Sequence, residues 1–190
     1  RYGRCPYNFT YRRCIKMNHI CIINDSLSEE ECDTLINKYS IKLKNSTTPP
    51  LNYDYYDTSY EDEILKNLAD KILPEYKKQN PEINCTPGFW SLKQFRFKKF
   101  KPGKSYDEFH SEQSYGKPRV LSVLTYLSNH NCGTEFIDGR MVKSIKGRSL
   151  LFPAFWTHAH KGQPCPENKE RYVLSAYATF DKREDNEFIA

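Results

Sequence analysis

No stretch of the sequence is apolar for long enough to cross a lipid bilayer. The longest apolar runs, such as RVLSVLTYL at residues 119–127, are far shorter than the roughly 18 residues that a membrane helix requires. The basic segment RYGRCPYNFTYRRC at the start is not followed by the apolar stretch of a signal peptide. We therefore expect a soluble chain without a membrane segment or a signal peptide, and these absences leave its compartment open.

Motifs of closely spaced cysteines are also missing. The seven cysteines are scattered and form no C-x-x-C pair, which excludes a zinc knuckle and a thioredoxin-type redox motif. Because their number is odd, at least one of them stays unpaired. Cys5 and Cys14 are separated by a short loop and could form a disulfide.

A strong excess of positive charge is absent as well, since 29 Lys and Arg residues face 24 Asp and Glu residues and the formal net charge is +5. Basic and aromatic residues alternate in KQFRFKKFKPGK at residues 93–104, a pattern that could bind nucleic acid or an acidic peptide. The simpler interpretation is a solvated strand face, with Lys and Arg alternating against Phe95 and Phe97. Nucleic acid is therefore only a minor hypothesis.

The length of 190 residues and the hydrophobic content of 38% fit one domain, residues 1–190. Its first part, residues 1–87, carries a short apolar strand at 20–24 and two helical patterns. A capping box predicts a helix in DSLSEEECDTLINKYS, and apolar spacing predicts a second in YEDEILKNLADKILPEYKKQ, with a kink or stop near Pro74. The segment between them is rich in Pro and Tyr, and this composition predicts a loop.

The second part, residues 88–180, is a succession of short strand-like runs. They are WSLKQFRFKKF, RVLSVLTYL, a hairpin GTEFIDGRMV that turns at Asp138-Gly139, SLLFP and RYVLSAYATF. Many strands with little helical signal between them predict an α+β, mainly β fold with a jelly-roll core. The helices of the first part would brace one sheet from outside.

Three side chains in this core have the chemistry of a metal site. His110 and Glu112 are two residues apart in FHSEQ, so an extended chain directs both to the same side. His158 and His160 in WTHAHKG supply a second candidate imidazole, and spacing alone does not choose between them. Two histidines and one carboxylate are typical of non-haem Fe(II), whereas a structural zinc site takes four protein ligands. The remaining histidines read as surface or turn residues.

Arg171 begins the last strand-like run. In RYVLSAYATF it shares one face with Val173, Ser175, Tyr177 and Thr179. If this face is turned inward, the buried charge requires a carboxylate partner such as the distal group of a 2-oxo acid. A surface salt bridge with a neighbouring acid fits the pattern equally well, so both alternatives stay open.

From about residue 93 to residue 180 the sequence resembles the prolyl 4-hydroxylase-like branch of the Fe(II)/2-oxoglutarate-dependent dioxygenases. The resemblance rests on FKPGKSYDEFHSE, LTYLSN, GTEF, IKGRSLLFP and HAHKGQPCPENKERY, in this order. It implies a double-stranded β-helix with helices packed outside, and the cofactors Fe(II), 2-oxoglutarate and O₂, with ascorbate as a further one. It also implies that the segment around residues 44–60 covers the mouth of the site.

The resemblance assigns a role to each candidate residue. His110, Glu112 and His160 match the metal ligands, while Arg171 and Tyr126 match the groups that hold the distal carboxylate of 2-oxoglutarate. Ser175 is a weaker candidate near that carboxylate, and no separate acid–base pair is expected. Three positions depart from the family: Glu112 stands where Asp is commoner, Phe100 where relatives often have Tyr, and PCPEN lies between His160 and Arg171.

The activity implied is hydroxylation of an aliphatic C–H, with a prolyl residue of a protein or peptide as the favoured substrate. The alternatives are a free amino acid or other small molecule, and a non-catalytic jelly-roll binding module. Nucleic-acid demethylation is not favoured, because relatives of that type carry a second Arg six residues after the first, where this chain has Tyr177. The sequence makes no prediction about the oligomeric state.

Overall fold

The computed structural model describes residues 19–43, 53–59, 61–85, 90–113 and 119–180. Within them the chain is mainly β, with two α-helices that both belong to its first part. The strands are β1 (Cys21–Ile23), β2 (Tyr53–Ser59), β3 (Trp90–Phe100), β4 (Arg119–Tyr126), β5 (Gly133–Phe136), β6 (Met141–Lys143), β7 (Ser149–Pro153), β8 (His160–Gly162) and β9 (Arg171–Phe180). The helices are α1 (Glu29–Ser40) and α2 (Glu63–Gln79), with short 3₁₀ helices at Pro81–Cys85 and Trp156–His158. None of the described helices is long and apolar enough to cross a membrane.

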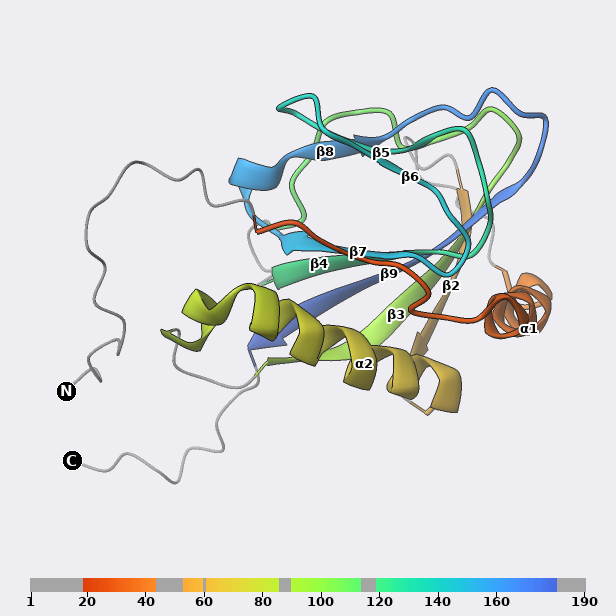
Figure 1. Ribbon diagram of the computed structural model, residues 1–190. Coiled ribbons are helices and arrows are strands. Elements are labelled where there is room, and N and C mark those ends of the chain that lie inside the picture. The colour runs from red at the N-terminus through yellow and green to blue at the C-terminus, as the bar shows by residue number, and fades with distance from the viewer. Residues whose placement is uncertain (1–18, 44–52, 60, 86–89, 114–118, 181–190) are drawn as a thin grey trace.

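Two antiparallel sheets face each other in a jelly-roll-like arrangement (Figure 1). The large sheet has the strand order β1-β7-β4-β9-β3-β2, and the small sheet has the order β6-β5-β8. His110 pairs with His160 through an isolated antiparallel bridge and so adds a further segment beside β8. The predicted mainly β architecture is confirmed, and so is the hairpin turn, where Gly139 has a φ of 86°.

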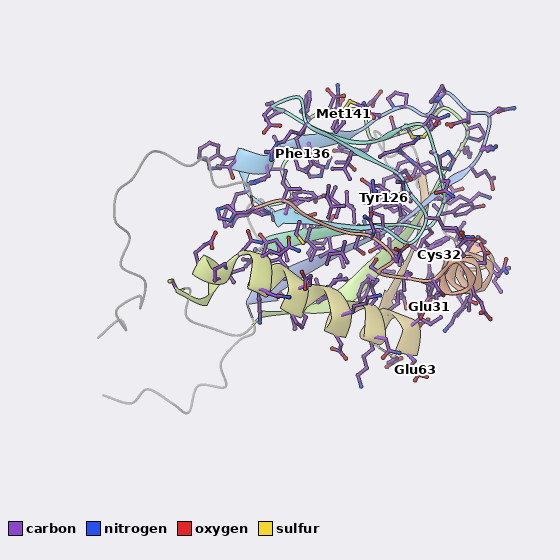
Figure 2. The ribbon with its side chains drawn as sticks, in the orientation of Figure 1. Glu31, Cys32, Glu63, Tyr126, Phe136 and Met141 are labelled. Atoms are coloured by element: carbon purple, nitrogen blue, oxygen red, sulfur yellow. A yellow bond between two sulfur atoms is a disulfide. The ribbon has the colours of Figure 1, made fainter. Side chains whose placement is uncertain are left out.

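The large sheet separates two apolar cores. On its outer face, Phe95, Phe97 and Leu174 pack against residues of both helices, including Leu35 and Leu68. Figure 1 shows α2 on this face, away from the small sheet, as the sequence predicts. Each fully buried leucine of this core contributes about 1.5–3 kcal/mol. The second core lies between the sheets, where Figure 2 labels two of its members, Tyr126 and Phe136.

The two helices begin where the sequence predicts. Ser28 caps α1 by accepting a hydrogen bond from the Glu31 amide at 3.1 Å, while the Glu31 carboxylate accepts one from the Ser28 amide at 2.7 Å. Of the two alternatives predicted near Pro74, a kink or a stop, the stop is excluded, because the helix continues to Gln79. Its last turn is held by Tyr76, which is buried and donates a hydrogen bond to the His19 carbonyl at 3.1 Å.

A second correction concerns the loop expected between the helices. Residues 53–59 form the edge strand β2, paired along its whole length with β3. The reason is local chemistry, since tyrosine favours strands and the rings of Tyr53 and Phe100 pack with their centroids 5.1 Å apart. Residues 44–52 of the expected loop lie outside the described residues, as do Cys5 and Cys14. Among the described residues, Cys132 and Cys165 form a disulfide.

Asp62 joins the two helices, and its replacement by alanine is expected to destabilise the fold by about 2–4 kcal/mol. Its carboxylate caps α2 through the Ile64 amide at 3.0 Å and accepts hydrogen bonds from Lys38 at 2.7 Å and from the buried hydroxyl of Tyr39. Asp62→Ala removes the cap and leaves the Tyr39 hydroxyl without this acceptor. Urea denaturation measures the loss. The exposed neighbour Glu61 is the control, and an equal loss in Glu61→Ala would contradict this role.

Candidate active site

A cavity of about 300 Å³ lies between the two sheets, a size that suits a small-molecule ligand. Its walls come from β3, β4 and β9 of the large sheet, from β2 at its edge, and from β5, β8 and the His110 segment. The charged and titratable side chains of the lining, tyrosines apart, are Arg96, Lys98, His110, Glu112, Arg119, His160 and Arg171. The cavity therefore contains all three predicted metal ligands and the predicted carboxylate-binding arginine.

Backbone pairing brings the two histidines together. The amide of His110 donates to the His160 carbonyl and the amide of His160 donates to the His110 carbonyl, both at 3.0 Å. Residues paired in this way project their side chains from the same side of a sheet, and the ring centroids of this pair are 4.5 Å apart. The Glu112 amide donates to the Ala154 carbonyl at 3.1 Å, which fixes the carboxylate beside them.

Hydrogen bonds also orient each imidazole. The Nδ1 of His110 lies 2.9 Å from the Glu108 carbonyl oxygen, and the Nδ1 of His160 lies 3.1 Å from the His158 carbonyl oxygen. A carbonyl oxygen can only accept, so both Nδ1 atoms carry the proton, and in a neutral ring this leaves the lone pair of Nε2 for a metal. These Nε2 atoms lie 3.6 Å and 3.8 Å from Glu112 Oε1. One nitrogen from each ring and one carboxylate oxygen lie within 4.8 Å of one another, and this donor set suits Fe(II).

The charges of this cluster suit a metal as well. Burial disfavours the Glu112 carboxylate, but its contact with His110 and the nearby charge of Lys98 outweigh burial and lower the pKa of Glu112 to about 2. Burial, together with the charge of His110, lowers the pKa of His160 to about 4. At neutral pH the cluster therefore presents an anionic carboxylate and a neutral His160, which are the protonation states that bind metals.

Arg119 holds the other oxygen of Glu112. Its Nη1 donates to Glu112 Oε2 at 2.8 Å and to the Glu112 backbone carbonyl at 3.1 Å. Its guanidinium lies 3.5 Å from the ring centroid of Tyr177. Because Arg119 occupies Oε2, only Oε1 of the carboxylate faces the two imidazoles. Sequence reasoning missed Arg119, since nothing in RVLSVLTYL indicates that its first residue points inward.

Arg171 stands elsewhere in the cavity, buried and without a carboxylate partner among the described residues. Its Nη1 donates to Cys132 Sγ and to the Gln163 carbonyl, both at 3.2 Å, while its Nε has no hydrogen-bond partner in the described part of the chain. Burial lowers the pKa of Arg171 to about 10. The alternative of a surface salt bridge is wrong, because Arg171 is buried, and the neighbouring Glu170 pairs with Lys99 at 2.7 Å. A buried, partly unsatisfied cation fits an anionic ligand.

Tyr126 also lines the cavity, and its ring is buried in the core between the sheets. Its hydroxyl lies 2.7 Å from the hydroxyl of Thr134, which lines the same cavity. Burial raises the pKa of Tyr126 to about 12, so the hydroxyl keeps its proton at neutral pH. Tyr126 can therefore donate a hydrogen bond to a carboxylate. The Val142 carbonyl, 3.4 Å away, accepts the same proton, and in the contact with Thr134 either hydroxyl can be the donor.

Three further expectations need correction. His158 lies in a 3₁₀ turn rather than in an extended segment, and its backbone carbonyl, not its imidazole, supports His160. Ser175 is buried but does not line the cavity. Of the two alternatives for His130, a surface or a turn residue, the surface is excluded: His130 is buried in a loop, with Nε2 at 3.1 Å from the Ser128 hydroxyl.

The prediction of a fully solvated basic face on β3 was also wrong. Phe95 and Phe97 pack in the core that includes residues of the helices, while Arg96 and Lys98 on the other face are half-buried and line the cavity. Arg96 pairs with Asp57 through two contacts of 2.6 Å and 2.9 Å. Burial lowers the pKa of Lys98 to about 8. The alternation of Phe with basic residues predicts that β3 has two different faces, but it does not show which face the small sheet covers.

The chain shares its fold with solved prolyl hydroxylases. The viral collagen prolyl hydroxylase of Paramecium bursaria chlorella virus-1, in a 2-oxoglutarate complex, has a TM-score of 0.70 at 20% identity, covering 90% of this chain and 100% of that chain. A Pseudomonas putida prolyl-4-hydroxylase has a TM-score of 0.68 at 13% identity, covering 88% and 96%. A Trichoplax adhaerens prolyl hydroxylase in complex with a hypoxia-inducible-factor peptide has a TM-score of 0.69 at 16% identity, covering 87% and 86%.

No protein-family model matches the sequence, and neither does any curated protein. At these low identities the likeness concerns the fold. The chemistry of this chain must therefore be argued from the side chains of its own cavity.

Proposed function

We propose that this chain is an Fe(II)- and 2-oxoglutarate-dependent dioxygenase that hydroxylates an aliphatic C–H, in the first place that of a prolyl residue in a protein or peptide. The observation that carries the proposal is one cavity with two complementary features. Two imidazoles and a carboxylate converge at one place in it, and a buried arginine lacking an acidic partner among the described residues stands at another.

In this proposal His110, Glu112 and His160 would hold Fe(II), with one nitrogen from each imidazole and one oxygen from the carboxylate as donors. The bound metal and co-substrate supply the oxidising chemistry. Arg119 keeps Glu112 in place through Oε2, and the two backbone carbonyls keep both imidazoles in the metal-binding tautomer. No separate acid–base pair is required of the protein.

Arg171 takes the distal carboxylate of 2-oxoglutarate through its unpaired Nε, with Tyr126 as a second donor. Phe100 lies under the guanidinium, whose centre is 4.5 Å from the ring centroid. This contact restricts Arg171 but leaves its N–H groups available to an anion, because the phenyl ring has no oxygen that could accept them. The phenylalanine at this position therefore orients the arginine, although it lacks the hydroxyl that relatives often have.

We further infer that residues 1–190 form one domain, with a double-stranded β-helix over 88–180 and a supporting region over 1–87. The facing antiparallel sheets support this, and so does the likeness to solved prolyl hydroxylases over 87–90% of the chain.

The substrate class is inferred from the cavity and from the neighbours. Tyr53, Tyr106 and Tyr177 line the cavity and suit packing against a prolyl ring. The Trichoplax enzyme, which is complexed with a peptide, supports a peptide substrate. A nucleic-acid substrate is less well supported. Tyr177 stands where nucleic-acid demethylases carry a second arginine, and its ring is stacked on Arg119.

Proline-rich peptides are expected to stimulate conversion of 2-oxoglutarate to succinate more than free proline, lysine or methylated DNA does. Succinate is measured with Fe(II) and O₂ present, and peptides with every proline replaced by alanine are the control. Stimulation by free proline alone would indicate a small-molecule hydroxylase. An absence of succinate formation under all conditions, in a protein that binds the metal, would indicate a non-catalytic binding module.

A further inference from the structure

Lys98 is a cation of the cavity to which the proposed function gives no role. It lies on β3 between Arg96 and Phe100 on the face that lines the cavity, and its Nζ is 5.1 Å from the ring centroid of Tyr53. No ion pair joins Lys98 to an acid among the described residues. The other cations of the cavity are engaged: Arg96 with Asp57, Arg119 with Glu112, and Arg171 with Cys132 and Gln163.

Strand register places Lys98 between two parts of the cavity. On β9, Arg171 is opposite Phe100 and Val173 is opposite Lys98, so Lys98 lies one same-face step from the arginine. Further along the same face of β9 comes Tyr177, on which Arg119 stacks while holding Glu112. One same-face step along a strand is about 7 Å, similar to the length of a five-carbon dicarboxylate. Lys98 therefore stands on the path from Arg171 to the three candidate metal ligands.

The charges of the cavity call for a second anion near Lys98. Within the described residues, Glu112 is the one acidic side chain of the lining, and Arg119 already pairs with it. A divalent metal at Glu112 and the two histidines would add positive charge beside Lys98. Two neighbouring cations in a partly buried cavity repel each other, and an anion bound between them offsets this repulsion.

We propose that Lys98 binds a carboxylate on the metal side of the cavity, distinct from the carboxylate assigned to Arg171. This inference rests on the proposed function. Two molecules could carry such a group: 2-oxoglutarate, through the carboxylate next to its keto group, and the molecule to be oxidised.

The first experiment measures binding without turnover. The protein is loaded with Mn(II) in the absence of O₂ and titrated calorimetrically with 2-oxoglutarate or with 2-oxobutyrate, which has no distal carboxylate. Lys98→Met is expected to weaken binding of both acids by on the order of 10- to 100-fold. Arg171→Met is expected to weaken binding of 2-oxoglutarate alone. Lys99→Met is the matched control, since Lys99 pairs with Glu170 on the other side of the strand, and it leaves both affinities unchanged.

Titration with Mn(II) alone separates this role from simple support of Glu112. Loss of a neighbouring positive charge should strengthen Mn(II) binding in Lys98→Met. Weaker Mn(II) binding with unchanged affinity for both acids would mean that Lys98 serves only to position Glu112, and would overturn the inference. Lys98→Arg keeps the charge and should retain most of the affinity for both acids, which guards against a folding defect in Lys98→Met.

The second experiment tests the other source of the carboxylate. Protein saturated with Mn(II) and 2-oxoglutarate is titrated with N-acetylproline and with N-acetylprolinamide, which differ only in that carboxylate. A preference for the acid that Lys98→Met abolishes, with 2-oxo acid binding unchanged, assigns the group to the molecule to be oxidised. If Lys98→Met changes neither 2-oxo acid binding nor this preference, the inference about Lys98 is overturned while the proposed function stands. If the wild-type protein binds Mn(II) but neither 2-oxo acid, the proposed function fails and the inference fails with it.

Discussion

Replacing His160 with alanine is expected to abolish metal binding, and with it all metal-dependent turnover of 2-oxoglutarate. His160 Nε2 faces the shared centre and lies 3.8 Å from Glu112 Oε1. Its loss leaves two donors, so the affinity should fall by more than the roughly 10- to 100-fold that loss of a supporting group costs. The measurement is the Mn(II) or Fe(II) content of the purified protein, about one equivalent per chain in the wild type.

His158→Ala is the matched control, because the two histidines are two residues apart and both are buried. His158 supports its neighbour through its backbone carbonyl, which the substitution keeps. The variant should therefore bind metal and turn over 2-oxoglutarate nearly as the wild type does. An empty site in His158→Ala beside a filled site in His160→Ala would overturn the ligand assignment.

Replacing Arg171 with alanine is expected to raise the concentration of 2-oxoglutarate required for half-maximal turnover while the metal content stays intact. The guanidinium is buried, and its Nε has no partner in the described part of the chain. Loss of a buried, charge-assisted contact costs about 2–5 kcal/mol, which corresponds to roughly 30-fold to several thousand-fold in affinity. Turnover measured across a wide range of 2-oxoglutarate concentrations gives the change.

Lys169→Ala supplies the comparison for Arg171→Ala, since Lys169 is an exposed cation two residues away. It should leave both the metal content and the 2-oxoglutarate requirement unchanged. The assignment of Arg171 fails if its variant retains the wild-type requirement, or if it loses the metal instead.

Local patterns predicted much of the fold. The capping box of Ser28 and Glu31 was confirmed because both hydrogen bonds join residues three apart, so no distant contact is needed. The same holds for the turn at Asp138-Gly139, where glycine tolerates a positive φ. Alternation also predicted that Arg171 and Tyr177 share one face of β9, and the structure shows that this face is turned inward.

The parts that sequence reasoning missed depend on how strands pair. Lys98 and Arg96 read as solvated because alternation defines two faces but does not say what covers each. Arg119 is a site residue only because β4 begins beside Glu112. Residues 53–59 read as a loop because their pairing with β3, about 40 residues later, leaves no local mark. Each of these features is set by contacts between distant segments.

The backbone pair between His110 and His160 ties together two segments that are 50 positions apart in the sequence. An ion bound by both imidazoles would join the segment around His110 to β8 a second time, in addition to the two backbone hydrogen bonds. Metal binding and the packing of this segment against β8 are then coupled, because each makes the other more favourable. Since Glu112 lies on the same segment, release of the ion would loosen two of its three donors at once, and the site would assemble or come apart as a unit.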